Sequence, residues 1–188
     1  MIEVRIHGRG GQGNVVAAYL LATAAFETGR NCQAFPSFGA ERRGAPVTAF
    51  VRIADRPIGR RCQVAEPAFL VVQDAGLLAI PATIDGLKPK GGIVVNSPRA
   101  SAEIEGETGH PVLALPASQL AADILGKPVP NVALLSAFLA ITGLLPAESL
   151  VGALKRRFKG DILARNIKLV ETVTAMVPAA SWGGMAHA

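Results

Sequence analysis

The sequence has few of the residues from which metal centres and self-contained catalytic sites are built. Of its 188 residues only two are cysteine and three are histidine. His7, His110 and His187 are scattered, and none stands at metal-ligand spacing from another ligand. Cys32 and Cys62 cannot supply an iron–sulfur cluster, which needs about four thiolates, nor a disulfide scaffold. They indicate reduced thiols in a cytoplasmic protein, with no metal held by this chain.

The sequence signatures of common hydrolases and of P-loop nucleoside triphosphatases are missing as well. The chain contains neither G-x-S-x-G nor G-x-x-x-x-G-K-[ST]. It also offers no evident pairing of a base with a nucleophile, so we assign no catalytic residue. This profile favours a subunit that shapes a site together with other chains.

Aromatic residues are also scarce, at 5% of the chain, and charged residues amount to 18%. The formal charge is +5, with basic residues gathered at 42–43, 56–61 and 155–159. Apart from Phe158, no aromatic residue is interleaved with these clusters, so the pattern argues against a nucleic-acid partner. An acidic partner, an anionic ligand or plain solvation would each explain the charge.

No hydrophobic run is long enough to cross a membrane, although half of the residues are hydrophobic and the mean hydropathy is +0.36. The longest candidate, Val132–Leu145, is interrupted by Ser136 and Thr142 and falls short of the roughly 18 apolar residues of a span. We interpret the excess hydrophobicity as subunit interface rather than lipid-facing surface. Because the first predicted strand begins at Ile2, no signal peptide is expected.

A glycine-rich turn is the most informative feature that is present. A predicted strand, Ile2–His7, leads into glycines with the spacing G-x-G-x-x-G, and a predicted helix, Asn14–Thr28, follows. Such a turn brings backbone N–H groups and a helix N-terminus up to an anion or another chain. Its candidate binding residues are Gly8, Arg9, Gly10, Gly11, Gln12 and Gly13.

The acidic residue that usually accompanies this motif is absent. Nicotinamide-binding folds place Asp or Glu at the end of the second strand, but Asn31–Pro36 contains neither, and Glu41 lies in the following loop. The motif therefore predicts a doubly wound α/β start and argues against an NAD site. Glycines that serve packing alone remain an open alternative.

Apolar runs and helical periodicity alternate along the chain. Strands are predicted at Ile2–His7, Asn31–Phe35, Val47–Ile53, Phe69–Gln73, Gly92–Val95 and Val112–Leu115. Helices are predicted at Asn14–Thr28, near Leu77–Ile80 with Asp74 as cap, from Ser118 to Leu125, and at Val132–Leu144, Pro146–Phe158 and Ile162–Met176. This order predicts an α/β fold with a doubly wound, mostly parallel sheet, helices on both faces and a helical C-terminal region. We expect one domain over 1–177 and a tail over 178–188, either without order or lying on a partner.

The loop Pro36–Pro46 combines a hydroxyl, an aromatic ring, a carboxylate and two guanidiniums. Arginine side chains suit carboxylate and phosphate groups as well as ion pairs between chains. Loops of this density are usually functional or interfacial, and a solvated surface loop is the alternative. Its candidate residues are Ser37, Phe38, Glu41, Arg42 and Arg43.

Asn131 stands at the start of the long apolar helix. The position favours a helix N-cap, and a side chain that faces a ligand is the alternative. The basic cluster at 155–159 has a structural explanation of its own, because it falls in the last predicted turn of Pro146–Phe158, where cations complement the helix dipole.

These segments resemble the gamma subunit of the 2-oxoacid:acceptor oxidoreductases, the pyruvate:ferredoxin oxidoreductase family. The matching stretches are Gly8–Gly13, Pro36–Gly44 and Val51–Asp55, with a weaker match over Asn131–Ala137. The resemblance extends over about residues 2–177. The sequence departs from the family pattern in having Phe38 where Tyr is common, Ala45 where a second Gly is common, and Ser136 in place of Gly.

The resemblance implies a subunit of a complex that oxidatively decarboxylates a 2-oxoacid to an acyl-CoA. Thiamine diphosphate, Mg and iron–sulfur clusters would then lie in partner subunits, namely the thiamine-binding alpha and beta types and a ferredoxin-like delta type. The gamma subunit would help to form the interface and the coenzyme A side of the active site. We expect backbone N–H groups at Gly11–Gly13 to bind a phosphate or a partner's carboxylate. Arg42 or Arg43 would bind a second anionic group, with Glu41 orienting one of them.

Two other functions remain open from the residues alone. One is a freestanding nucleotide-binding α/β protein resembling a small dehydrogenase, although the missing ribose-binding acid argues against it. The other is a purely structural adaptor subunit that contacts no ligand.

Overall fold

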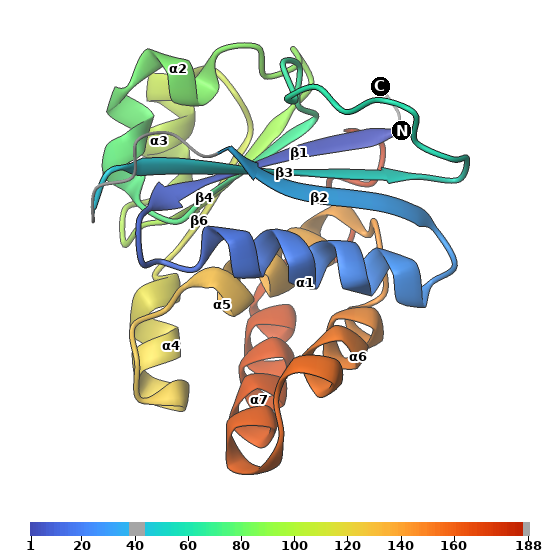
Figure 1. Cartoon of the computed structure of the whole chain (residues 1–188). Coiled ribbons are helices and arrows are strands. Elements are labelled where there is room, and N and C mark those ends of the chain that lie inside the picture. The colour runs from blue at the N-terminus through green and yellow to red at the C-terminus, as the bar shows by residue number, and fades with distance from the viewer. Residues whose placement is uncertain (38–43, 186–188) are drawn as a thin grey trace.

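The computed structural model of the chain describes residues 1–37 and 44–185. Its core is one six-stranded sheet with the strand order β2-β3-β1-β4-β5-β6 (Figure 1). The strands are β1 (Ile2–Arg9), β2 (Asn31–Ser37), β3 (Pro46–Ala54), β4 (Phe69–Val72), β5 (Gly92–Asn96) and β6 (Val112–Leu115). β1, β4, β5 and β6 are parallel neighbours, whereas β3 is antiparallel to both β1 and β2. The predicted α/β class is confirmed, with a mixed sheet.

The position of β3 was not evident from the sequence. β2 runs in the same direction as β1, but the β2–β3 hairpin folds back so that β3 lies between them. The strand that follows α1 therefore becomes the sheet edge instead of pairing with β1. β1 and β2 are parallel, so both strands end on the same side of the sheet. The loop that joins β2 to β3 therefore begins and ends close to the carboxyl end of β1. The register places Arg9 opposite Pro46 and Ser37 opposite Thr48.

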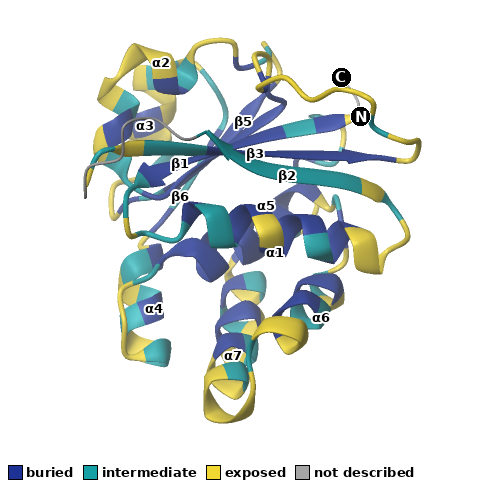
Figure 2. Cartoon of the chain, in the orientation of Figure 1, coloured by how far each residue is buried: buried dark blue, intermediate teal, exposed yellow. Residues whose placement is uncertain are grey.

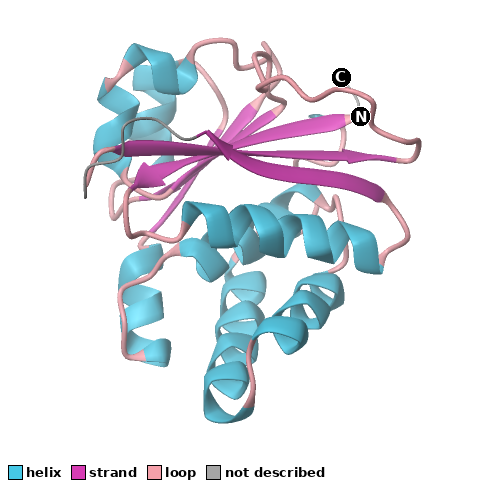
Figure 3. Ribbon diagram, in the orientation of Figure 1, coloured by secondary structure: helices cyan, strands magenta, loops and turns pink. Residues whose placement is uncertain are grey.

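Helices cover both faces of the sheet, as predicted (Figure 3). The helices on one face are α1 (Asn14–Glu27), α4 (Ala117–Leu125), α5 (Asn131–Thr142), α6 (Ala147–Arg157) and α7 (Gly160–Met176), and those on the other are η1 (Ala75–Ala79), α2 (Pro81–Ile84) and α3 (Ser101–Thr108). α3 was not predicted from the sequence. α1 and α5 lie next to the sheet, and α6 and α7 pack below them as a further layer (Figure 1).

The apolar run that the sequence analysis singled out forms α5 and lies inside this chain. Eleven of the twelve residues of α5 are buried, because the helix is enclosed between the sheet and α7 (Figure 2). A helix that is apolar on every side needs such a position. The hydrophobicity of this run therefore stabilises the core of the chain itself, and any apolar subunit interface has to lie elsewhere on the chain.

Part of the segment assigned to a tail packs on the core. The N–H of Ala180 donates to the Ala140 carbonyl at 2.7 Å, and that of Trp182 donates to the Ile141 carbonyl at 2.8 Å. The Trp182 ring stacks on Phe69 with 6.4 Å between ring centroids. Trp182 thus extends the core of this chain, and backbone hydrogen bonds attach the segment around it to the end of α5.

Helix ends follow the sequence in some places and depart from it in others. The Asp74 carboxylate caps η1 by accepting from the Gly76 N–H at 2.9 Å, as predicted. Lys155 and Arg156 lie in the last turn of α6, as predicted, and Arg156 also pairs with Glu27 on α1. Ser118 does not cap α4: Pro116 holds the cap position, and the Ser118 N–H donates to the Asn96 side chain at 3.0 Å.

No helix in the described part of the chain has both the length and the hydropathy of a membrane span.

Candidate functional site

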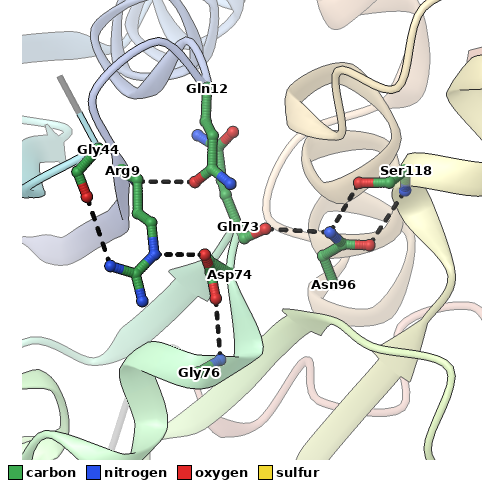
Figure 4. A network of polar contacts seen from close by, with 8 residues as sticks. All are labelled: Arg9, Gln12, Gly44, Gln73, Asp74, Gly76, Asn96 and Ser118. Atoms are coloured by element: carbon green, nitrogen blue, oxygen red, sulfur yellow. Dashed lines mark hydrogen bonds and ion pairs between the residues drawn. The ribbon is translucent and has the colours of Figure 1, made fainter.

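The glycine turn follows β1, next to the end of β4. From these two neighbouring strands the chain continues to helices on opposite faces of the sheet. β1 continues into α1 on the face that Phe69 and Val71 line, whereas β4 continues into η1 on the face of Leu70 and Val72. β1 and β4 are adjacent and parallel. Adjacent parallel strands with connections on opposite faces leave a crevice at their carboxyl ends, where ligands of open α/β folds bind. The close-up in Figure 4 shows this edge.

Hydrogen bonds within the turn hold its backbone in shape. Gly10 N–H donates to the Ala45 carbonyl at 3.0 Å, and Arg9 N–H donates to Gln12 Oε1 at 2.7 Å. Gly11 and Gly13 adopt positive φ angles of 97° and 83°, a region that favours glycine. Gly13 is the N-cap of α1 and supplies no side-chain cap. The first N–H groups of α1 therefore have no intrahelical acceptor and present positive partial charge.

Two of the glycines are also needed for packing within the chain. A Cβ at Gly8 would lie 2.2 Å from Asn14 Oδ1, and a Cβ at Gly13 would lie 2.8 Å from Asn131 Nδ2. At Gly11 the space is open in the described structure, so only its φ requires glycine. The glycine spacing alone is thus no evidence of a ligand, and the polar groups around the turn decide what this edge can bind.

Arg9 joins the turn to the segment after β4. Its Nε donates to Asp74 Oδ2 at 2.6 Å, and its Nη1 donates to the Gly44 carbonyl at 3.4 Å (Figure 4). The Arg9 side chain is about 39% exposed. Arg9 therefore links β1, β4 and one end of the hairpin loop at a single point.

Gln73 lies directly after β4 and is fully buried. Its N–H donates to the His7 carbonyl at 2.8 Å, and its carbonyl accepts from Asn96 Nδ2 at 3.0 Å (Figure 4). Neither its side-chain Oε1 nor its Nε2 has a partner in the described chain. A buried polar group without a partner costs about 1–3 kcal/mol. This carboxamide therefore needs a water, a ligand or another group from outside the described residues.

A second buried carboxamide lies on the same face. Asn14 Nδ2 donates to the Val47 carbonyl at 2.7 Å, while its Oδ1 has no partner among the described residues. Asn96 completes the polar edge by donating to Ser118 Oγ at 2.8 Å and accepting from the Ser118 N–H. Sequence reasoning did not select Gln73 or Asn96 as site residues. Their signal was a polar residue at the carboxyl end of a buried parallel strand.

His7 faces the opposite side of the sheet from α1, because successive side chains of β1 alternate. Burial, together with the positive charge of Arg5, lowers the pKa of His7 to about 4. His7 is therefore neutral at physiological pH and does not attract anions. Burial also lowers the pKa of Arg5, whose Nη2 donates to the carbonyls of Thr83 and Asp85 at 2.9 and 2.7 Å.

Asn131 comes close to the glycine turn although 118 positions separate it from Gly13. It is the first residue of α5, and Pro130 holds the N-cap position that the sequence favoured for Asn131. Its Oδ1 accepts from the Val132 N–H at 2.8 Å. The Nδ2 group faces Gly13.

The structure places the two ends of the loop Pro36–Pro46 near the glycine turn. Ser37 is the last residue of β2, and its Oγ accepts from Gln63 Nε2 at 3.1 Å. Gly44 and Ala45 contact the glycine turn through the bonds given above. The remaining candidates of this loop, Phe38, Glu41, Arg42 and Arg43, lie outside the described residues. Among residues 1–37 and 44–185, no group of three or more His, Cys, Asp or Glu could hold a metal ion.

Curated relatives cover nearly the whole chain. Pyruvate synthase subunit PorC of Methanocaldococcus jannaschii is 46% identical over 171 residues, which cover 91% of this chain and 94% of that protein. The pyruvate/ketoisovalerate oxidoreductases common subunit gamma of Thermococcus kodakarensis is 46% identical over 175 residues, with coverage of 91% and 94%.

Solved structures share the fold. The pyruvate oxidoreductase subunit PORC of Thermotoga maritima superposes with a TM-score of 0.83 at 32% identity, covering 93% of this chain and 95% of that one. The 2-oxoglutarate:ferredoxin oxidoreductase of Magnetococcus marinus, solved with 2-oxoglutarate, coenzyme A and succinyl-CoA, has a TM-score of 0.78 at 22% identity. It covers 96% of this chain, which spans 31% of that longer chain.

The family model described as pyruvate ferredoxin/flavodoxin oxidoreductase matches residues 3–176. This match and the relatives named as gamma and PorC subunits confirm the resemblance carried by the two loop motifs. The chain therefore belongs to the pyruvate ferredoxin/flavodoxin oxidoreductase family, as a member of its gamma-subunit type.

Proposed function

We propose that this chain is the gamma subunit of a cytoplasmic, thiamine diphosphate-dependent 2-oxoacid:acceptor oxidoreductase complex, which decarboxylates a 2-oxoacid oxidatively to an acyl-CoA. The observation that carries the proposal is the 46% identity to a pyruvate synthase subunit over 91% of the chain. The chain's own composition agrees, because it supplies no catalytic pair of residues and only two cysteines. Its role is to complete the interface and the coenzyme A side of the active site.

The groups at the crevice fit coenzyme A by their chemistry. The uncapped start of α1 presents N–H groups to a phosphate. The Gln73 carboxamide, buried behind these groups, carries a donor and an acceptor that have no partner among the described residues. Coenzyme A, when bound, supplies the thiol that accepts the acyl group. The candidate binding residues are Gly8, Arg9, Gly10, Gly11, Gln12, Gly13, Ser37, Phe38, Glu41, Arg42, Arg43 and Asn131.

The remaining chemistry belongs to partner subunits in this proposal. Thiamine-binding subunits of the alpha and beta types hold thiamine diphosphate with Mg. A ferredoxin-like subunit of the delta type holds the iron–sulfur clusters, which need more thiolates than Cys32 and Cys62 provide. In this proposal Arg42 and Arg43 bind either coenzyme A or an acidic group of a partner.

The test is made in the assembled complex, after co-expression of this chain with its partner subunits. We expect Arg42→Ala and Arg43→Ala to raise the KM for coenzyme A by about tenfold, as loss of one charge-assisted contact would, or to weaken assembly. Arg60→Ala removes an exposed arginine from another basic segment and is the matched control. Unchanged KM and unchanged assembly in both loop variants would remove the loop from the site. A complex that turns over normally with every loop and turn variant would support the structural-adaptor alternative.

A further inference from the structure

A pocket of about 380 Å³ opens on the helical face, between α1, the segment that joins α4 to α5, and the first turns of α7. Its volume falls within the range of small-molecule sites. Most of its wall is apolar, including Val16 and Leu20 of α1, Phe158 directly after α6, and Ile162 in the first turn of α7. Ile162 is about 60% exposed, so the pocket is open to solvent on that side.

Two buried carboxamides line the pocket, Asn131 at 7% and Asn166 at 4% exposed. Asn131 Oδ1 accepts from the Val132 N–H, and Asn166 Nδ2 donates to the Ile162 carbonyl at 2.8 Å. Within the described chain the other polar atom of each side chain, Asn131 Nδ2 and Asn166 Oδ1, has no hydrogen bond. The two side chains therefore bring one donor and one acceptor without a partner to the wall of the pocket.

The electrostatics of the pocket favour an anion. Residues from the first turns of both α5 and α7 line it, and helix N-termini carry positive partial charge. Arg165 and Asp161 pair with each other at 2.8 Å. This leaves Lys127, which has no ion pair among the described residues, as the uncompensated charge at the rim.

We propose that this pocket binds a small amphipathic organic anion, with its apolar body between α1 and α7 and its anionic group at Lys127 and the two helix starts. The proposal goes beyond the proposed function, because it requires no partner subunit, although Asn131 is shared with the candidate coenzyme A residues. Coenzyme A and free aromatic or aliphatic carboxylates share this chemistry, and the test distinguishes them.

The test uses the full chain and 8-anilinonaphthalene-1-sulfonate, an aromatic sulfonate whose fluorescence rises on binding. We expect Lys127→Glu to weaken binding by about tenfold, since it replaces attraction by repulsion, and Ile162→Glu to weaken it similarly. Both positions are exposed, so the fold tolerates these changes. Lys168→Glu, which alters an exposed lysine of α7 outside the pocket, is expected to change the affinity by less than about twofold.

Competition identifies the source of the ligand. Displacement of the probe by coenzyme A would identify coenzyme A as the ligand of the pocket. Displacement by phenylpyruvate would identify the ligand as a free organic acid. Equal affinity of wild type and both pocket variants, or failure of both competitors, would overturn the proposal. Neither result bears on the proposed function, which is judged by assembly and by the KM for coenzyme A in the complex.

Discussion

Arg9 and Asp74 lie 65 positions apart in the sequence and meet at the switch point of the sheet, with Arg9 Nε 2.6 Å from Asp74 Oδ2. The other oxygen of Asp74 caps η1 by accepting from Gly76. One carboxylate thus fixes both the start of η1 and the orientation of the glycine turn. This relationship ties the glycine turn to the segment that follows β4.

Asp74→Ala should lower the free energy of unfolding by about 1–2 kcal/mol, because it removes the η1 cap together with the ion pair. Arg9→Ala removes the partly exposed ion pair and the long bond to the Gly44 carbonyl, and it should cost less than about 1 kcal/mol. Urea unfolding of both single variants and the double variant gives the coupling energy, for which we expect about 0.5–1 kcal/mol. Asp55→Ala is the control, since its carboxylate is about 82% exposed in its pair with Arg30. A coupling energy of zero would contradict the linkage.

Gly13→Ala should be more destabilising than Gly11→Ala, although both positions have positive φ. An alanine at Gly11 meets open space and should cost about 1 kcal/mol in backbone strain. At Gly13 the new Cβ also meets Asn131 Nδ2 at 2.8 Å, which should bring the loss to about 3 kcal/mol. Adding Asn131→Ala should make the double variant less destabilised than the sum of its parts. Equal unfolding free energies of the two glycine variants would show that the contact with Asn131 is irrelevant.

Gln73→Leu should leave the free energy of unfolding unchanged or raise it by about 1 kcal/mol, because it removes an unpartnered buried amide. If the carboxamide serves a ligand, the assembled complex should nonetheless lose affinity for coenzyme A. Gln33→Leu is the matched control: it deletes the acceptor of a 3.0 Å bond from buried Arg52 and should destabilise by about 1–3 kcal/mol. The two measurements are urea unfolding and the KM for coenzyme A. A strongly destabilised Gln73→Leu variant would instead mean that the amide is satisfied within the folded chain.

His7 should make the protein less stable in mild acid. Its folded-state pKa of about 4 lies below the ordinary 6.5, so the unfolded chain binds more protons between these values. The free energy of unfolding should therefore fall as the pH is lowered from 6.5 to 4, with about 3 kcal/mol assigned to this group. Unfolding measured across this range should show a shallower slope in His7→Gln. Identical slopes would place the acid sensitivity elsewhere.

Trp182 reports directly on the C-terminal segment, because it is the one tryptophan of the chain. A Cβ at Gly92 would lie 2.6 Å from its ring, so Gly92→Ala should displace the ring from Phe69. We expect red-shifted emission and greater access to acrylamide, while Trp182→Ala should cost about 3 kcal/mol of stability. Gly106→Ala, where the space is open, should leave the emission unchanged. If Gly92→Ala kept the blue-shifted emission of a buried tryptophan, the packing of Trp182 described above would be refuted.

Sequence reasoning located elements well where local pattern decides them. The run Phe69–Val72 and the turn glycines before Asn14 carry their signal within a few residues, through burial and backbone conformation. Asp74 was identified as a cap for the same reason, since its acceptor and the Gly76 N–H are two positions apart. By contrast, the sequence predicted Ser118 as the cap of α4, but an N–H group in the first turn of α4 donates to Asn96 of β5 instead. No local signal distinguishes those two cases.

The sequence by itself determined the α/β class, the strand–glycine turn–helix start and the family, because periodicity, turn chemistry and motif spacing are short-range properties. Tertiary structure alone decided that β3 would lie between β1 and β2, that α5 would be enclosed rather than exposed, and that Gln73 and Asn14 would be buried with polar atoms unsatisfied. It also decided that Asn131 would contact Gly13. These outcomes depend on which distant surfaces pack together, and that is set by the burial of the whole apolar surface rather than by any single segment.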